Sequence, residues 1–215
     1  MANGSNGKKS ALILWFSEIT IEDTPLVGGK NSSLGEMYRE LGRKGINIPN
    51  GFAITAAAYR LFVKEAGIEK EVKRILSGLN IKDVEKVAEA GLRIRELIKG
   101  AEFPQKLKEE IVEAYAKMCR EYGSHVDVAV RSSATAEDLP NASFAGQQES
   151  YLNVRGDHEL MESIKKAFAS LFTNRAISYR VDQKFDHFAV KLSVAVQKMA
   201  RSDRGTSGVM FTIDT

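Results

Sequence analysis

The feature that most constrains the fold is a change in the spacing of apolar residues along the chain. Over about the first 120 residues, apolar side chains recur at intervals of three and four, the period of an amphipathic helix. Farther on, Val190, Leu192, Val194 and Val196 alternate with other residues, which is typical of a strand. We therefore predict the α+β class, with a helical N-terminal part followed by a mixed α/β part.

The boundaries of the elements follow from capping and turn residues. Gly67 and Gly123 are expected to end helices, and Pro104 suits a first helical turn. Helices are predicted over residues 31–43, 55–66, 68–77, 83–99, 104–122 and 159–181, and strands over residues 12–16, 52–54, 126–130, 149–154, 188–199 and 208–213. Residues 1–10 are expected to be a flexible N-terminus, and residues 11–215 to form one domain.

Composition excludes several classes of protein. Hydrophobic residues make up 43% of the 215 residues, which is enough for a core, but the longest apolar run, residues 11–16, is far shorter than a membrane helix of about 18. The only cysteine, Cys119, and the three scattered histidines argue against a disulfide or a Cys/His metal site. A net charge of +3 does not require nucleic acid as a partner. We therefore expect a cytoplasmic protein that binds neither membrane nor nucleic acid.

The segment VGGKN, residues 27–31, places glycines and a lysine at the start of a predicted helix. Phosphate is often held in this way, because small residues and unpaired helix amides let the backbone approach it. The segment is not a P-loop, since Thr24 and Asn31 stand where that pattern needs Gly and Ser or Thr. Lys30 opposes the helix dipole, and a bound anion would remove that conflict. The alternative is a glycine turn with a solvated lysine.

Arg131 follows the alternating valines of residues 126–130 and is expected on the opposite face, at the end of that strand. A guanidinium in this position can bind two phosphate oxygens at once. A loop of about 16 mostly small or polar residues follows up to Gln147, and its backbone amides can surround a polyanion. The alternative is a surface arginine in a salt bridge with Glu137 or Asp138, beside an ordinary loop.

Gln197 lies in the second alternating segment, on the face that carries Lys191, Ser193 and Ala195. Its amide offers both a donor and an acceptor, so it can bind a base or a phosphate. The alternative is a glutamine that faces solvent. The histidines and Cys119 have no such pattern around them, and we expect structural or surface roles for them.

Several segments together resemble the N-terminal nucleotide-binding region of the phosphoenolpyruvate synthase family. The matching stretches are VGGKNSSLGEM (27–37), GINIPNGFAIT (45–55), VRSSATAEDLPNASFAGQQESYLNV (130–154), LFTNRAISYR (171–180) and VAVQKMARSDRGTSGVMFTIDT (194–215). The third stretch is the most specific and is also similar to rifampin phosphotransferases. It looks less like pyruvate, phosphate dikinases, which have a methionine-containing loop at that place.

The resemblance implies an ATP-grasp-like fold and transfer of the β-phosphoryl group of ATP to a carrier histidine. It implies that Lys30 and Arg131 are catalytic residues that contact the ATP phosphates. Gly146 and Ser150 match the glycine-rich lid and the strand after it, and Gln197 matches a nucleotide contact. These residue types suit phosphoryl transfer, which depends on positioned cations and backbone donors more than on a nucleophilic side chain.

The resemblance also implies partners that lie outside this chain. In the family, the carrier histidine, the residues that hold Mg2+ and the pyruvate-binding barrel all come later in the sequence. We therefore expect residues 11–215 to be an ATP-binding domain truncated at its C-terminal end. It would bind ATP with Mg2+ and meet the phosphohistidine-carrying domain of the full-length chain, where alone pyruvate is bound. The fragment is expected to be inactive.

Two alternatives to this interpretation stay open. The chain can be the corresponding domain of a rifampin phosphotransferase-like dikinase, which shares the third stretch. It can also be a non-catalytic module that binds a nucleotide or docks to a partner. The sequence that follows Thr215 and a titration with ATP would separate these readings.

Overall fold

The computed structural model describes residues 4–135, 138–139, 142–143, 149–183, 185–188 and 190–210. Its centre is a five-stranded antiparallel sheet in the order β1-β2-β7-β3-β6. The strands are β1 (Ile13–Trp15), β2 (Gly51–Ile54), β3 (Val128–Ala134), β6 (Ser150–Val154) and β7 (Leu192–Lys198). A separate short hairpin joins β4 (Asp138–Leu139) to β5 (Ala142–Ser143).

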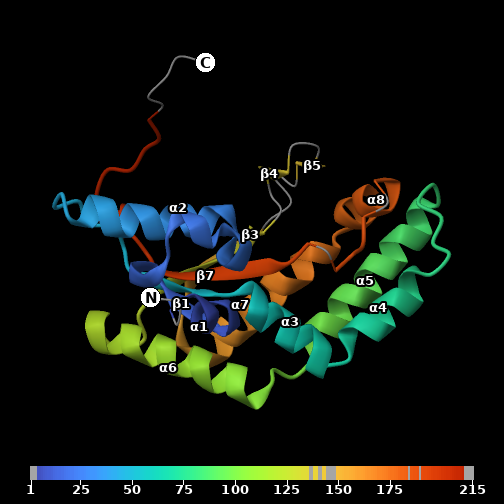
Figure 1. Cartoon of the computed structure of the whole chain (residues 1–215), viewed down its shortest axis with the longest axis horizontal. Coiled ribbons are helices and arrows are strands. Elements are labelled where there is room, and N and C mark those ends of the chain that lie inside the picture. Colours follow the sequence, from blue (N-terminus) through green and yellow to red (C-terminus); the bar gives the residue numbers. More distant parts are fainter. Residues whose placement is uncertain are drawn as a thin grey trace.

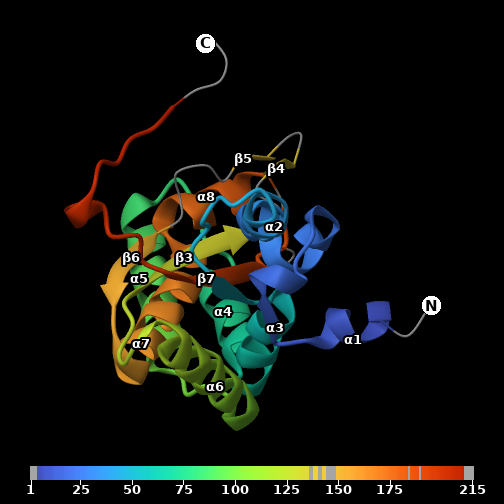
Figure 2. The same ribbon diagram turned by 90° about the vertical axis from the view of Figure 1, so that its left-hand side faces the viewer.

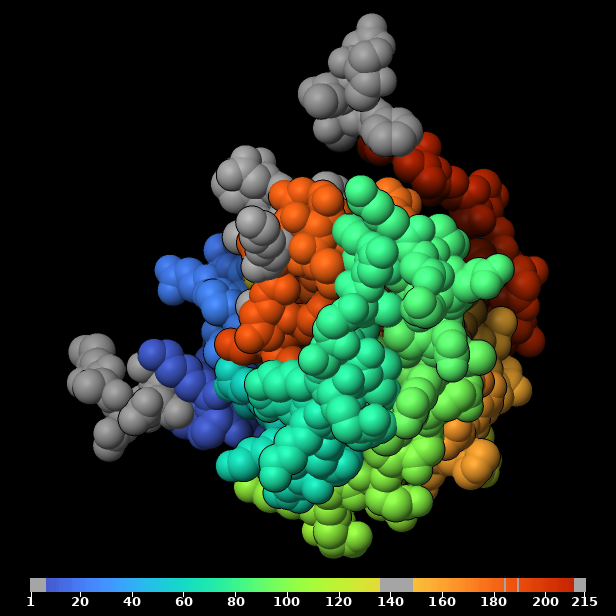
Figure 3. All heavy atoms as spheres, turned by 90° about the vertical axis from the view of Figure 1, so that its right-hand side faces the viewer, coloured from blue at the N-terminus to red at the C-terminus, as the bar shows by residue number. Residues whose placement is uncertain are grey.

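Helices cover both faces of the sheet. Helix α2 (Thr24–Gly42) lies on one face, whereas α3 (Ala56–Glu65), α6 (Gln105–Tyr122) and α7 (Gly156–Ala169) lie on the other (Figures 1 and 2). Helices α4 (Ile68–Leu76), α5 (Val84–Gly100) and α8 (Asn174–Asp182) pack together at one end, and Figure 3 shows the surface that they form. The short elements are α1 (Gly4–Ser10), η1 (Phe16–Glu18), η2 (Ile21–Asp23), η3 (Ser170–Phe172) and η4 (Ser202–Arg204). In the part of the chain described here, no helix is long and apolar enough to cross a membrane.

Strands β2 and β7 are buried on both faces, and each face of the sheet contributes to a different core. The larger core contains Val194 and Val196 of β7 together with apolar residues of α3, α5, α6 and α7. The smaller one lies under α2 and includes Ala53 and Ala195. Because these two residues are small, α2 can approach the strands closely. The α+β class predicted from the sequence is confirmed, as is the shared face of the alternating residues from Val190 to Val196.

Several helices begin and end close to their predicted boundaries. Helix α3 starts after Thr55, whose hydroxyl oxygen accepts a hydrogen bond from the Ala58 amide at 3.3 Å. The single helix predicted over residues 159–181 is wrong, because the structure divides this stretch into α7, η3 and α8. The division lies at Thr173, which has extended backbone and caps α8 by accepting from the Ala176 amide at 3.3 Å. A threonine cap inside an apolar pattern was overlooked.

Other differences concern the ends of elements. Residues 4–10, which we expected to be part of a flexible start, form α1. Strand β3 continues to Ala134, so the first three residues of the expected loop after Arg131 are strand. Residues 208–210 contain no strand, and residues 211–213 of that predicted strand lie outside the described residues.

Candidate functional site

Gly28 interrupts α2 where the helix crosses β3. Its backbone has φ 78° and ψ 165°, a region that is open essentially only to glycine. A β-carbon there would lie 2.3 Å from Ser133 Oγ, 2.6 Å from the Ser133 carbonyl oxygen and 2.7 Å from that of Ala134. The predicted break at Gly28 is confirmed, but α2 already begins at Thr24 and resumes at Gly29, earlier than the predicted helix start at residue 31.

Asn31 fastens the resumed helix to the sheet. Its backbone amide donates to Ser133 Oγ at 3.3 Å, and its Nδ2 donates to Ser193 Oγ at 3.0 Å. Ser193 Oγ in turn donates to the carbonyl oxygen of Ile54 at 2.7 Å. Asn31 is 1% exposed, so these bonds are shielded from water and hold α2 against β3, β7 and β2.

A cavity of about 610 Å³ opens between the first turns of α2 and the sheet. Lys30 reaches it from the first turn after Gly28, and Arg131 reaches it from β3. It is lined by Ile21, Thr24, Gly29, Lys30, Asn31, Ser32, Ser33, Leu34, Met37, Arg131, Ser132 and Ala195. The structure thus brings together two of the predicted site residues, which are about 100 positions apart in the sequence.

The lining of this cavity suits an anion with several oxygens. Two cations and several hydroxyl groups face it, and the residues that line it include no carboxylate. The N-terminal amides of the resumed helix add partial positive charge on the same side. Such a set can bind phosphate groups and favour charge that develops on their oxygens.

Arg131 does not lie at a strand end, as we predicted, but in the middle of β3. It stands in register with Ser150 of β6 on one side and Ala195 of β7 on the other. Arg131 is the exposed residue in a strand that is otherwise buried, and its neighbour Val130 belongs to the larger core. The side chains of Glu137 and Asp138, its suggested salt-bridge partners, lie outside the described residues.

Two of the other predicted site residues, Gln197 and Ser150, are not among the residues that line the cavity. Gln197 lies on the Arg131 side of the sheet but does not line the cavity. It is 8% exposed and its Nε2 donates to the Pro49 carbonyl oxygen at 3.0 Å, so the solvent-facing alternative is wrong. Ser150 is exposed and aligned with Arg131. Gly146 lies outside the described residues.

Sequence reasoning gave no role to Asn31, Ser133 or Ser193, which hold α2 against the sheet beside the cavity. A signal was present in β7, where Ser193 is the one polar residue between Leu192 and Val196. A polar residue in a strand buried on both faces must find a partner, because an unpaired buried hydroxyl is costly. The partner itself could not be named, since Asn31 is 162 residues away.

Asp23 anchors the chain just before α2. Its Oδ2 accepts hydrogen bonds from Lys8 Nζ at 2.6 Å, from the Thr20 amide at 2.8 Å and from Thr20 Oγ1 at 3.0 Å. Burial disfavours the charged carboxylate, but these three donors outweigh it and hold the pKa of Asp23 below its usual value. Folding is therefore linked to the ionisation of this group.

We expect Asp23→Asn to lower the free energy of unfolding at pH 7 by about 1.5–3 kcal/mol, because hydrogen bonds to a charged acceptor are lost. The carboxylate of the native protein stabilises the fold fully above the unfolded pKa near 3.8, and this contribution disappears as pH falls through the lower folded pKa. Urea unfolding of both proteins between pH 7 and pH 3 measures the difference. A difference that stays constant over that range would contradict the linkage.

Comparison with known proteins gives the family. Residues 24–215 match the family described as "Pyruvate phosphate dikinase, AMP/ATP-binding domain". The chain belongs to this family. In this AMP/ATP-binding domain, the matched residues include all those that line the cavity between α2 and the sheet except Ile21.

Curated relatives of this AMP/ATP-binding domain are much longer than the chain. It is 59% identical over 213 residues to a phosphoenolpyruvate synthase of Synechocystis sp., which covers 97% of the chain and 26% of the relative. It is 55% identical to that of Aquifex aeolicus, over 97% of the chain and 24% of the relative, and 48% identical to that of Escherichia coli K12, over 98% and 26%. The chain therefore spans about a quarter of the length of these relatives, as the predicted resemblance to this family implied.

Proposed function

We propose that this domain binds ATP with its phosphates in the cavity between α2 and β3. The observation that carries the proposal is the convergence of Lys30 and Arg131 on one cavity whose lining residues include no carboxylate. Membership of a family described as AMP/ATP-binding supports a nucleotide as the anion. Ser150 and Gln197 lie on the same face of the sheet and extend the proposed site toward the rest of the nucleotide.

In this proposal the two cations have different roles. Arg131, with its planar fork, binds two oxygens of the transferring phosphates, and Lys30 supplies a mobile point charge beside them. Gly28 and Asn31 position Lys30, because they fix where the helix resumes. Gly146 would belong to a lid over the phosphates in an ATP-grasp-like domain. The residues of this chain thus stabilise charge on a phosphoryl group that is transferred elsewhere.

Magnesium fits this part of the chain poorly as a tightly held ion. It prefers carboxylate oxygens, and the residues that line the cavity offer hydroxyl and amide oxygens instead. Among the residues that the structure describes, no group of three or more His, Cys, Asp or Glu side chains is placed to hold a metal. We propose that Mg2+ arrives with ATP and that its protein ligands come from outside these residues.

For the longer protein we propose the reaction in the names of the relatives. A phosphoenolpyruvate synthase would convert ATP, pyruvate and water to AMP, phosphoenolpyruvate and phosphate in the cytoplasm, through a phosphohistidine on a separate domain. The three relatives described above favour this reading over a rifampin phosphotransferase-like enzyme. Because pyruvate and the histidine domain would lie outside this chain, we expect no pyruvate-dependent formation of AMP by the purified chain. Turnover by the chain alone would overturn that division of roles.

Isothermal titration of the chain with ATP and Mg2+ tests the proposed site. Saturable binding that competes with ADP supports it, and it also separates the proposal from a module that only docks to a partner. The proposal would be contradicted by a chain that circular dichroism shows to be folded but that does not bind ATP. Such a chain would give no heat of binding and, at millimolar ATP, no displacement of a fluorescent ATP analogue.

Lys30→Ala should weaken ATP binding about tenfold while slightly raising the thermal midpoint. Affinity falls because a phosphate contact is lost, and stability rises because the cation opposed the dipole of the resumed helix. Lys108→Ala is the matched control, since Lys108 is exposed on α6, across the sheet from the cavity. Equal ATP affinity in both variants would return Lys30 to the role of a solvated surface lysine.

A further inference from the structure

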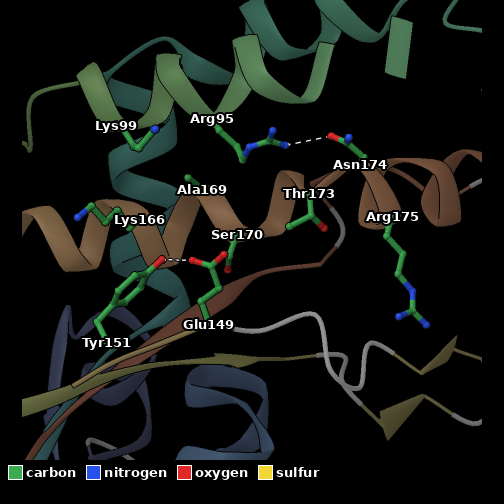
Figure 4. A pocket seen from close by; sticks show the side chains of 10 residues that line it. All are labelled: Arg95, Lys99, Glu149, Tyr151, Lys166, Ala169, Ser170, Thr173, Asn174 and Arg175. Atoms are coloured by element: carbon green, nitrogen blue, oxygen red, sulfur yellow. Dashed lines mark hydrogen bonds between the residues drawn. The ribbon is translucent and has the colours of Figure 1, made fainter. Parts of the chain in front are cut away.

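A second cavity of about 650 Å³ lies on the other side of β6. Ser150 faces the α2 side of the sheet, so the next residue, Tyr151, faces the opposite side, where α5, α7 and the start of α8 enclose this second cavity. Figure 4 shows Arg95 and Lys99 extending from α5 toward α7 and the start of α8, with Tyr151 of β6 and Glu149, which precedes β6, facing them. We call this cavity the α5–α8 pocket.

The side chains around the α5–α8 pocket are strongly cationic. Four of the residues that line it are Arg95, Lys99, Lys166 and Arg175, against one acidic residue, Glu149. The Glu149 carboxylate already accepts the hydroxyl proton of Tyr151 in a hydrogen bond (Figure 4). Burial, together with this bond, raises the pKa of Tyr151, so the phenol stays a donor. The charge of Glu149 offsets only one of the four cations, so the residues that line the pocket keep an excess of positive charge.

Two of these cations form hydrogen bonds or ion pairs within the chain, whereas Lys166 and Arg175 have no ion pair among the described residues. Arg95 Nη1 donates to the Phe172 carbonyl oxygen at 2.7 Å and to Asn174 Oδ1 at 3.2 Å, which fixes the direction of its guanidinium. Lys99 forms an ion pair with Glu96 at 2.5 Å at the rim. The ion pairs among the described residues include none to Lys166 or Arg175, and Lys166 Nζ lies 6.0 Å from the centroid of the Tyr151 ring. Folding has therefore gathered like charges that repel one another.

The first turn of α8 adds to this positive potential. Arg175 is in that turn, the turn has no acidic residue, and Thr173 satisfies only the Ala176 amide with its side chain. The helix dipole places partial positive charge where Arg95 and Arg175 already stand. An anion in the pocket would relieve the repulsion among the cations and the unfavourable dipole at the same time.

We propose that the α5–α8 pocket is a binding site for a small phosphate-bearing anion, separate from the ATP site. Two guanidinium groups and two ammonium groups around one cavity match the several oxygens of a phosphate better than the single plane of a carboxylate. The cavity is large enough for a phosphorylated small molecule. The site does not depend on the proposed ATP function, because none of its residues lines the cavity of Lys30 and Arg131.

The test uses the chain carrying Arg131→Ala, which weakens the proposed ATP site, and titrates it with pyrophosphate and with glycerol 3-phosphate at constant ionic strength. Adding Lys166→Gln and Arg175→Gln should weaken binding of the tighter ligand at least tenfold. The control pair is Lys73→Gln and Arg74→Gln, which removes the same charge from the exposed face of α4. This control should leave the affinity within about twofold, because it leaves the pocket intact.

The position of binding is read from backbone amide shifts in nuclear magnetic resonance spectra. We expect the largest shifts at residues 173–176 and in β6. Tighter binding of pyrophosphate would identify an oligophosphate as the ligand class, and tighter binding of glycerol 3-phosphate would identify a phosphate monoester. Binding of neither ligand overturns the proposal. So does an equal loss of affinity in the control pair, which would mean general attraction to a basic surface.

Discussion

Gly28→Ala should lower the free energy of unfolding by at least about 3 kcal/mol, because the methyl group has no space and its backbone no allowed conformation. The φ of 78° and ψ of 165° are strained for any residue with a β-carbon. Two of the three atoms that the methyl group would meet are backbone oxygens of Ser133 and Ala134, which cannot rotate away. Chemical denaturation followed by circular dichroism measures the loss.

Gly45→Ala is the matched control for Gly28→Ala. Gly45 also has a positive φ, of 81°, but a β-carbon there would meet nothing within 4 Å. The control therefore carries backbone strain without the clash, and we expect it to cost only about 1–2 kcal/mol. If both variants lost the same stability, the close approach of α2 to β3 would not be as described. A folded Gly28→Ala protein should also bind ATP more weakly, since Lys30 would be displaced.

Arg131→Ala should reduce ATP affinity about 10- to 100-fold, the largest effect that we expect on binding from one side chain. This range corresponds to the loss of charged hydrogen bonds to phosphate, worth about 1.5–3 kcal/mol. Stability should change by less than about 0.5 kcal/mol, because Arg131 is the exposed residue of β3. Titration calorimetry and thermal unfolding of the same sample separate the two effects.

Two further variants test whether the effect of Arg131→Ala comes from the guanidinium group itself: Arg131→Lys and Arg74→Ala. Lysine keeps the charge but loses the fork, so we expect an affinity between those of the native protein and Arg131→Ala. Arg74 is exposed on α4 and does not line the cavity. Arg74→Ala therefore removes the same charge as Arg131→Ala but leaves the site unchanged. Native affinity in Arg131→Ala would leave the cavity without its main proposed phosphate ligand. A similar loss in Arg74→Ala would attribute the effect to net charge alone.

Local chemistry made much of the fold readable from the sequence. The cap at Thr55, the helix start at Pro104 and the stop at Gly123 each depend on neighbours within a turn or two, and α3 and α6 lie where these signals predict them. Lys30 could be singled out because its conflict with the helix dipole is also local. The break at Thr173 was missed since an apolar period runs through it, although its capping chemistry is present in the sequence.

The remaining features depend on which strands become neighbours, and no local pattern contains that information. Arg131 was expected at a strand end because the small residues after it resemble a loop, but pairing with β7 extends β3 to Ala134. The solvent-facing alternative for Gln197 failed for a related reason, since alternation alone does not tell whether the second face is covered. Here α2 and the chain near Pro49 cover it.

The place of β7 in the sheet has a consequence for how the protein is made. Strands β2 and β3 pair with β7 and not with each other, so the β1–β2 ribbon and the β3–β6 ribbon stay separate until residues 192–198 have been synthesised. Two-stranded ribbons are marginally stable alone. A ribosome must therefore finish nearly all of these 215 residues before the sheet can close, and the bond from Asn31 to Ser193 forms only then. Nucleotide binding by a nascent chain would thus report that β7 has entered the middle of the sheet.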